Sequence, residues 1–383
     1  MEFDRIIDLN SLIKKNSFFL FGPRGTGKSF WIKKSLSSKS TKIFDLLDDD
    51  IYERFLRRPK QLSEEISDND KIIVIDEIQK LPKLLDEVHR LIEDKKRNLK
   101  FLLTGSSARK LKRNDVNMLG GRAWEAHFFP FISREIKNFD LLKYFNLGGL
   151  PKVYLSKYPE EDLKAYVRLY ISQEIKEEAL TRKIENFVRF LDVIAMSNGE
   201  EIVYQNLAND SGVPPRTIEN YINILVDTLM GFELYPFLLT KKRKAITRSK
   251  FYFFDIGVVN KLTNRGPISE GNPVFGECFE HFIILEIRAY LSITRKDYNL
   301  FYWRTKNGAE VDLIIGKVLA IEIKSTKSVH DRHIDNLKLL KEEGLIKNFI
   351  IVSQDPVRKK MDNNITSLFW KDFIADLWSG KLC

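Results

Sequence analysis

The chain has 383 residues, a formal net charge of +10 and only two cysteines. This length predicts two or three domains, each large enough to bury its own core. Two cysteines exclude a disulfide framework and a cysteine metal cage. The excess of positive charge favours an anionic partner, either nucleic acid or membrane lipid, although a generally basic surface would give the same balance.

The sequence predicts no insertion into membranes. Residues 1–5 are charged and lack the apolar core of a signal peptide. The longest apolar stretches, such as residues 282–285, are far too short to span a bilayer. We therefore expect a cytoplasmic protein.

The first predicted element is an apolar strand over residues 17–21, which runs into a glycine-rich loop and then a helix. The loop fits the pattern G-x-x-x-x-G-K-[ST], and a plain strand–helix turn is the alternative. Its residues are Gly22, Pro23, Arg24, Gly25, Thr26, Gly27, Lys28 and Ser29. Glycines let backbone N–H groups wrap phosphate oxygens, and the positive end of the helix faces the same phosphates. We expect Lys28 to contact the β- and γ-phosphates of ATP and Ser29 to ligate Mg²⁺.

An apolar strand is predicted over residues 71–75, after a strand at 41–45 and a helix at 48–58. Its continuous apolar character is typical of a parallel sheet that is covered on both faces. The strand ends in Asp76 and Glu77. Downstream of a phosphate loop, this pair predicts that Asp76 holds Mg²⁺, mostly through water, and that Glu77 orients or deprotonates the attacking water. An acidic pair can also simply begin a helix.

The next predicted strand, residues 100–104, leads into small polar residues. A hydroxyl at this strand end could reach between the two acids and the γ-phosphate. Ser106 is our first choice for this sensor position, with Ser107 and Thr104 as alternatives. A simple N-cap for the following helix explains these residues equally well.

Arg122 follows a Leu-Gly-Gly turn. An arginine on such a loop could stabilise charge on the γ-phosphate of a neighbouring subunit in a homo-oligomer. A structural pairing of Arg122, or phosphate binding by Arg109, stays open.

The motifs occur in the same order as in a group of AAA+ superfamily ATPases that carry a C-terminal domain of unknown function, and the chain resembles that group. The matching segments are residues 22–29, 75–79, 103–107 and 121–122, and later 129–135 and 148–151. The resemblance covers nearly the whole chain. It implies a prokaryotic ATPase and does not settle the cellular role.

A helical pattern over residues 159–196 is expected to pack beneath the ATPase sheet as a small bundle. Residues 202–254 then follow the order helix, turn, helix and two strands, which is typical of a winged helix–turn–helix. Between the two strands lies the basic run 241–244, where a wing would meet the phosphate backbone of DNA. The alternative is a protein-docking module whose basic run is merely solvated.

The last predicted domain holds a second group of candidate residues. Glu280 lies on a predicted helix, Asp312 on a strand, and Glu322 and Lys324 on the next strand. This spacing resembles the core of PD-(D/E)xK nucleases, in which carboxylates hold Mg²⁺ or Mn²⁺ and the lysine acts on water beside the scissile phosphate. Here Asp312 follows valine rather than the usual proline. A solvated sheet face, or a nuclease fold without catalysis, is the alternative.

The whole sequence predicts an α/β protein with four parts. They are a parallel-sheet P-loop AAA+ domain at 1–150, a helical bundle or lid at 151–200, a winged helix–turn–helix at 201–256 and a PD-(D/E)xK nuclease-like α/β domain at 257–383. The predicted function is ATP hydrolysis coupled to DNA binding and metal-dependent DNA cleavage. One alternative is a nucleotide-regulated switch that binds a protein partner through a silent nuclease fold. Another is an ATP-responsive DNA-binding regulator.

Overall fold

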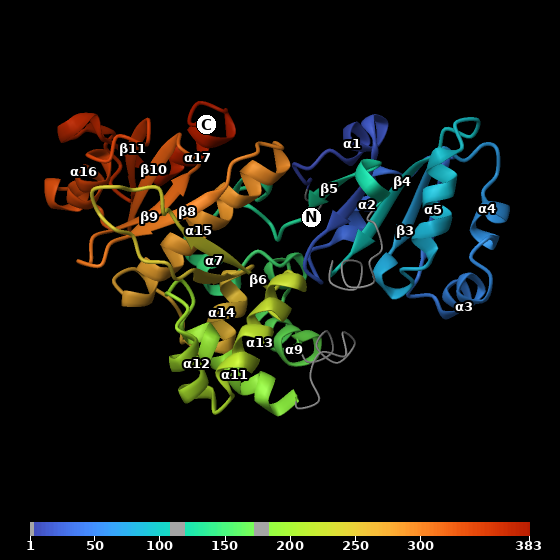
Figure 1. The fold of residues 1–383 in the computed structure, drawn as a ribbon, viewed down its shortest axis with the longest axis horizontal. Coiled ribbons are helices and arrows are strands. Elements are labelled where there is room, and N and C mark those ends of the chain that lie inside the picture. The colour runs from blue at the N-terminus through green and yellow to red at the C-terminus, as the bar shows by residue number, and fades with distance from the viewer. Residues whose placement is uncertain (1–3, 108–118, 172–183) are drawn as a thin grey trace.

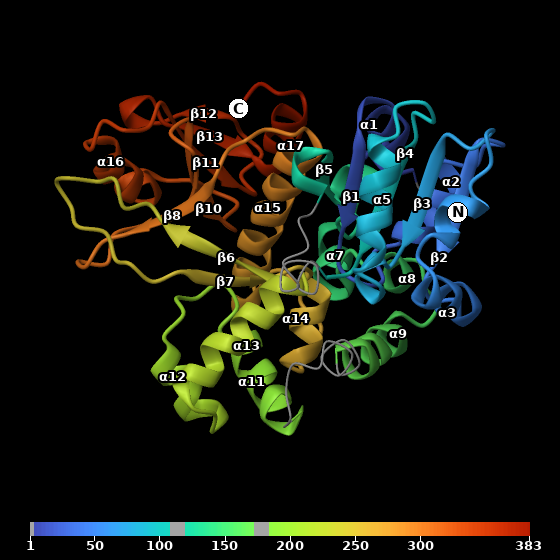
Figure 2. The same cartoon turned by 45° about the vertical axis from the view of Figure 1, so that its right-hand side comes forward.

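The computed structural model describes residues 4–107, 119–171 and 184–383. Two sheets lie toward opposite ends of the long axis of the molecule, and a group of helices lies between them and to one side (Figures 1 and 2). Among the described residues, no helix is both long and apolar enough to cross a membrane.

The N-terminal sheet is parallel, with the strand order β2-β3-β4-β1-β5. Its strands are β1 (Ser17–Phe21), β2 (Thr41–Asp45), β3 (Ile72–Asp76), β4 (Lys100–Gly105) and β5 (Ala123–His127). The helices around it are α1 (Leu9–Lys15), α2 (Lys28–Ser35), α3 (Asp49–Arg57), α4 (Gln61–Glu65), α5 (Leu84–Glu93) and the 3-10 turns η1 (Ile78–Lys80) and η2 (Leu119–Gly121). Because β4 lies between β1 and β3, the loops that follow these three strands meet at one edge of the sheet. The predicted parallel sheet is confirmed.

Short elements connect this sheet to the rest of the chain. They are η3 (Ser133–Glu135), α7 (Leu141–Leu147), α8 (Pro151–Tyr154), α9 (Pro159–Ala165) and the π-helical turn η4 (Tyr166–Ile171). The aromatic side chains of Phe131, Tyr144 and Phe145 are buried in one cluster with Phe279 and Phe282 of the C-terminal domain. This segment therefore contributes to the C-terminal core, although it directly follows the N-terminal sheet.

The glycine pair at 148–149 has a packing reason. Asp255 is buried and accepts hydrogen bonds from the backbone N–H groups of Gly149 (2.7 Å) and Val258 (3.1 Å). A Cβ on Gly148 would lie 2.0 Å from an Asp255 carboxylate oxygen, and φ at Gly148 is +73°. A side chain at 148 would therefore displace Asp255 or strain the backbone.

The next helices form a core of their own. They are α11 (Ile184–Met196), α12 (Tyr204–Ser211), α13 (Pro215–Asp227) and α14 (Ile256–Leu262). Phe187 of α11 packs edge-on against Tyr221 of α13, with 4.9 Å between the ring centroids. The bundle expected beneath the ATPase sheet is thus wrong in its placement for α11, because the apolar face of this helix packs on the predicted helix–turn–helix.

The C-terminal sheet is mixed, with the strand order β12-β13-β11-β10-β9-β8-β6-β7. Its strands are β6 (Gly231–Pro236), β7 (Lys250–Phe253), β8 (Leu300–Arg304), β9 (Glu310–Ile315), β10 (Leu319–Lys324), β11 (Asn348–Ser353), β12 (Lys359–Lys360) and β13 (Thr366–Phe369). The helices are α15 (Pro273–Ile293), α16 (Asp335–Lys341), α17 (Trp370–Trp378) and the turns η5 (Asp331–Ile334) and η6 (Asp362–Asn364). Strand β6 pairs with β8, as in Tyr235 opposite Phe301, so the β6–β7 hairpin continues this sheet.

Candidate functional site

The loop between β1 and α2 has the backbone that a phosphate cradle requires. Gly25 and Gly27 have φ values of +80° and +88°, which favour glycine. The buried ammonium of Lys28 donates to the carbonyl oxygens of Gly22 (2.6 Å) and Pro23 (3.1 Å), so it lies inside the loop. Backbone donors and one ammonium around a concave loop suit a nucleoside triphosphate.

The other loop residues hold the loop in place or face outward. The Thr26 hydroxyl donates to the carbonyl of Pro23 at 2.8 Å. The Arg24 carbonyl accepts from the hydroxyl of Tyr166 at 3.0 Å. Ser29 is exposed in the first turn of α2, where its hydroxyl is accessible to a metal ion at the phosphates.

A cavity of about 410 Å³ opens beside this loop. Its walls combine loop backbone with apolar side chains from α2 and α8. The lining residues are Arg5, Gly25, Thr26, Gly27, Phe30, Trp31, Phe131, Pro151, Lys152 and Leu155. The cavity is large enough for a flat aromatic ring system next to the phosphate cradle.

Asp76 and Glu77 lie at the end of β3, at the same edge of the sheet as the loop. The Thr104 hydroxyl donates to the Asp76 carboxylate and accepts from the backbone N–H of Glu77 at 2.9 Å. Glu77 has a φ of +60°, which is uncommon for a residue with a side chain. Thr104 therefore fixes both acids at the strand end.

The Glu77 carboxylate is held by two neutral side chains. Gln79 donates to it, and the Ser106 hydroxyl lies 3.2 Å from the same oxygen. Gln79 also donates to Ser106 at 3.0 Å. Ser107 instead donates to the carbonyl of Asp227 at the end of α13, at 3.3 Å. Of the three sensor candidates, Thr104 and Ser106 contact the acids. The sequence predicts no role for Gln79, which contacts both Glu77 and Ser106.

Arg122 lies at the opposite edge of the sheet from the phosphate loop. Ala123 pairs with Ser17, the first residue of β1, whereas the loop follows Phe21. The intervening strand spans about 13 Å. The Arg122 guanidinium pairs with Glu93 at the end of α5, at 2.7 Å. Arg109 lies outside the described residues.

The C-terminal candidates come together on β9, β10 and α15. The Lys324 ammonium lies 2.6 Å from the Glu322 carboxylate and 3.7 Å from that of Asp312. Asp312 also accepts from the backbone N–H of Ile323 at 2.6 Å. Glu280 accepts from the hydroxyl of Tyr252 at 2.6 Å. The four predicted residues thus share one partly buried, charged site.

Burial and mutual repulsion shift the titration of these carboxyl groups. Burial and the Asp312 carboxylate together raise the pKa of Glu280 to about 7 and raise the pKa of Glu322 well above its usual range. Burial lowers the pKa of Lys324, but the carboxylates of Asp312 and Glu322 outweigh it, so the net pKa is raised. Lys324 therefore stays charged between the two acids.

The β6–β7 hairpin supplies two residues to this site that the sequence did not single out. Lys250 of β7 is buried, and its ammonium lies 2.5 Å from Glu310 and 3.9 Å from Glu280. Tyr252, on the same face of β7, donates to Glu280. The acidic residues are thus compensated by lysines from two segments.

The site contains oxygen atoms that suit a metal ion, but they are not arranged to coordinate one. Within the described part of the chain, no three His, Cys, Asp or Glu side chains converge on one position as metal ligands. One carboxylate oxygen of Glu322 is buried without a hydrogen-bond partner. Because Lys324 lies between Glu322 and Asp312, a divalent cation would have to displace its ammonium.

The basic run lies in the loop between β6 and β7 and contacts α16 and its C-terminal end. The Arg243 guanidinium pairs with Glu342 at 2.6 Å. The backbone N–H groups of Lys241 and Lys242 donate to Glu343 at 2.8 and 2.9 Å. The side chains of Lys241, Lys242 and Lys244 are exposed. Arg243 thus has a structural partner, while the three lysines point into solvent.

Known protein families match the chain in three consecutive parts. Residues 14–137 match the AAA domain family. Residues 138–269 and 275–370 match two families that are each described as a domain of unknown function, DUF8612 and DUF4143.

Similar proteins are found in archaea and bacteria. An uncharacterized protein of Methanocaldococcus jannaschii is 26% identical, over 94% of this chain and 85% of its own length. An uncharacterized protein of Mycobacterium tuberculosis is 24% identical over 67% of this chain, and the match spans 59% of its own length. The solved Walker-type ATPase of Pyrococcus abyssi is 17% identical with a TM-score of 0.46, over 67% of this chain and 93% of that chain. Residues 14–137 thus match an AAA domain and contain the parallel sheet, and residues 275–370 match the DUF4143 domain.

Proposed function

We propose that the protein binds ATP with Mg²⁺ in the loop 22–29, hydrolyses it, and uses the nucleotide state to control DNA binding and metal-dependent DNA cleavage by its C-terminal half. The observation that carries the ATPase part is the position of Lys28 inside the glycine-rich loop, beside the strand end that holds Asp76 and Glu77. Release of phosphate from ATP by the purified protein tests it, and absence of release with and without DNA would contradict it.

Each group at the strand ends has a role in this reaction. Lys28 binds the β- and γ-phosphates in place of its present carbonyl partners. Ser29 and Asp76 would hold Mg²⁺, which neutralises charge on the phosphate oxygens when it is bound. Glu77 accepts a proton from the attacking water, while Ser106 and Gln79 orient its carboxylate. Thr104 holds Asp76 and Glu77 in their positions at the end of β3 through its two hydrogen bonds.

The cavity beside the loop is the place for the nucleobase. Phe30 lines it and is 66% exposed, so its ring is accessible for stacking. Phe30→Ala should weaken ATP binding by about tenfold, because stacking of a base on an aromatic ring contributes about 1–3 kcal/mol. Leu56→Ala is the matched control, because Leu56 is 50% exposed on α3 outside the cavity. Fluorescence titration with ATP and with tripolyphosphate measures the effect, and an equal loss for both ligands would contradict stacking.

Arg122 is proposed to act on the nucleotide of a neighbouring subunit. The register of β5 on β1 places it at the far edge of its own sheet, about 13 Å from the loop. In mixtures of the two variants, the Arg122→Ala subunit keeps Glu77 in its own site. The neighbouring Glu77→Gln subunit supplies Arg122 to that site. Such mixtures should regain ATP hydrolysis that neither variant has alone. No recovery in oligomers shown to be mixed would leave Arg122 with its structural pairing to Glu93.

The exposed lysines of the β6–β7 loop are proposed to contact DNA phosphates. Replacing Lys241, Lys242 and Lys244 by glutamine should reduce the slope of log affinity against log salt by up to about 3, because each phosphate contact contributes about 0.9. Arg243 stays in place because it pairs with Glu342. The control variant replaces three other exposed lysines, Lys14, Lys15 and Lys39, by glutamine, so it loses the same amount of positive charge. If the slope is unchanged in a salt titration, the loop does not contact DNA phosphates and its role is limited to docking.

A second candidate function has its own supporting observation. Lys324 and Lys250 already neutralise the acidic residues around Asp312 and Glu280. A site compensated in this way could serve as a stable scaffold that binds DNA or a protein partner without cutting it. Metal-dependent cleavage of DNA by the wild-type protein separates the two candidate functions.

A further inference from the structure

Residues 128–135, here called the bridge segment, pack directly against the phosphate loop. The backbone N–H of Phe128 donates to the carbonyl of Phe21 at 2.7 Å. A Cβ on Gly22 would lie only 2.3 Å from the carbonyl oxygen of Phe128. The first residue of the loop and the bridge segment are therefore in backbone contact, and neither can shift alone.

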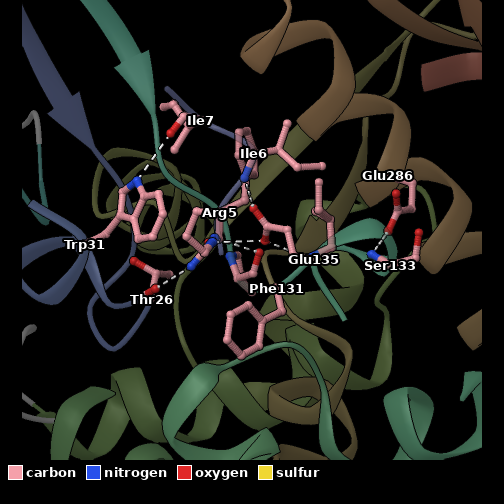
Figure 3. A network of polar contacts seen from close by, with 12 residues as sticks. Arg5, Ile6, Ile7, Thr26, Trp31, Phe131, Ser133, Glu135 and Glu286 are labelled. Carbon is pink, nitrogen blue, oxygen red and sulfur yellow. Dashed lines mark hydrogen bonds and ion pairs between the residues drawn. The ribbon is translucent and has the colours of Figure 1, made fainter. Parts of the chain in front are cut away.

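Arg5 joins the bridge segment to the loop a second time. Its guanidinium donates to the carbonyl of Thr26 at 3.0 Å (Figure 3). It also donates to the carbonyls of Phe129 and Pro130 at 2.5 and 3.3 Å. It also pairs with Glu135 at 2.9 Å. The planar fork of arginine can make these bonds at the same time, which the single ammonium of lysine cannot do.

The ion pair of Arg5 and Glu135 is enclosed. Their side chains are 7% and 1% exposed. Glu135 also accepts from the backbone N–H of Ile6 at 2.9 Å (Figure 3). Removing one partner of such a pair leaves an uncompensated charge, so the two side chains have to move together.

The other side of the bridge segment is attached to α15. The backbone N–H of Ser133 donates to Glu286 of α15 at 2.5 Å (Figure 3). Arg288, also on α15, lies over the ring of Phe129, 5.7 Å from its centroid. Helix α15 carries Glu280 too, six residues or about 9 Å along the helix from Glu286. A continuous path thus runs from the phosphate loop to the C-terminal charged site.

We propose that Arg5 is a positioning residue that transmits nucleotide occupancy from the phosphate loop through the bridge segment to α15. The proposal rests on ATP binding in the loop. When phosphates draw Lys28 away from the carbonyls of Gly22 and Pro23, the loop backbone readjusts, and Thr26 carries Arg5 with it. Glu135 and the carbonyls of the bridge segment follow the same guanidinium. The result is a change at Glu286, and so at the helix that presents Glu280.

Hydrogen–deuterium exchange of the full-length protein tests this path. In the wild type, Mg²⁺ and a non-hydrolysable ATP analogue should change the exchange rate of α15 amides by about fivefold or more, as for a typical coupling between sites. Arg5 also lines the cavity beside the loop, so Arg5→Lys is compared with the wild type at a saturating concentration of the analogue, where it should lose most of this change. Arg265→Ala is the matched control, because Arg265 pairs with Glu277 of α15 at 2.6 Å and should leave the response intact.

A double variant separates loss of the coupling from loss of folding. Arg5→Met with Glu135→Gln removes the guanidinium without leaving a buried unpaired charge. It should fold and bind nucleotide, and α15 should no longer respond. A wild-type response that persists in the double variant would overturn the role of Arg5. Nucleotide binding by the wild type without any change in α15 would overturn the coupling alone. Absence of nucleotide binding would overturn the proposed function and the coupling with it.

Discussion

Replacing Lys28 by alanine is expected to weaken ATP binding by about 100-fold, because the phosphates lose charge-assisted hydrogen bonds worth about 1.5–3 kcal/mol each. Glu77→Gln should retain binding, because glutamine keeps an oxygen that can accept from Gln79 or Ser106. It should lower the rate of hydrolysis by about 10²–10⁴-fold, because the amide cannot accept the proton of the attacking water. Calorimetry with Mg²⁺ and ATP measures binding, and phosphate release measures turnover.

Lys33→Ala is the control for this pair of variants. Lys33 lies on the same helix, α2, but its side chain is exposed. Binding and turnover should match the wild type. An equal loss of binding in Lys28→Ala and Glu77→Gln would contradict the division of roles, and so would full turnover in Glu77→Gln.

The phosphate loop and the sheet behind it follow from short stretches of sequence. Strand β1 and the loop 22–29 are contiguous, so the apolar run and the glycine spacing already contain the local geometry. The two acids at the end of β3 and the hydroxyls at the end of β4 are predictable for the same reason, since parallel strands end at one edge of a sheet. The alternation of β10 likewise predicts that Glu322 and Lys324 share a face.

Contacts between distant segments were not predictable in this way. Arg5 reaches Phe129 across 124 residues, and nothing in residues 4–8 marks it as part of a site. The basic neighbours of Arg243 in the sequence favour a phosphate contact. Its partner Glu342 is 99 residues away and lies beside it in the fold, in which β6 pairs with β8. Lys250 stands in an apolar strand, and its charged partners come from α15 and β9. Periodicity locates elements, whereas these pairings depend on how the elements pack.

In the C-terminal site, Asp312→Asn is expected to weaken binding of Mn²⁺ or Mg²⁺ by at least about 100-fold and to abolish DNA cleavage. Asparagine preserves the size of the side chain and can still accept from the backbone N–H of Ile323, so the sheet should stay intact. The charge that the metal requires is lost. Calorimetry with each metal, together with cleavage of labelled single-stranded, duplex and branched DNA, measures the two effects.

Lys324→Met should separate metal binding from chemistry. The ammonium now lies between Glu322 and Asp312, so its removal should leave metal affinity unchanged or higher. Cleavage should fall by about 100-fold or more, because the metal would remain but no lysine ammonium would act on the water beside the scissile phosphate. ATP binding should survive in both variants, since neither residue contacts the phosphate loop.

The control for Lys324 is Lys327→Ala. Lys327 follows the same strand, is 66% exposed, and pairs with Glu270 at 2.5 Å, outside the acidic site. It should leave metal binding and cleavage unchanged. If the wild type binds DNA but cuts none of the three substrates with either metal, with or without ATP, the cleavage proposal is wrong. The lysines that neutralise Asp312, Glu322 and Glu280 would then be the permanent counter-charges of a binding scaffold. Lys324→Met should then destabilise the domain, because the buried carboxyl groups of Asp312 and Glu322 would lose their cation.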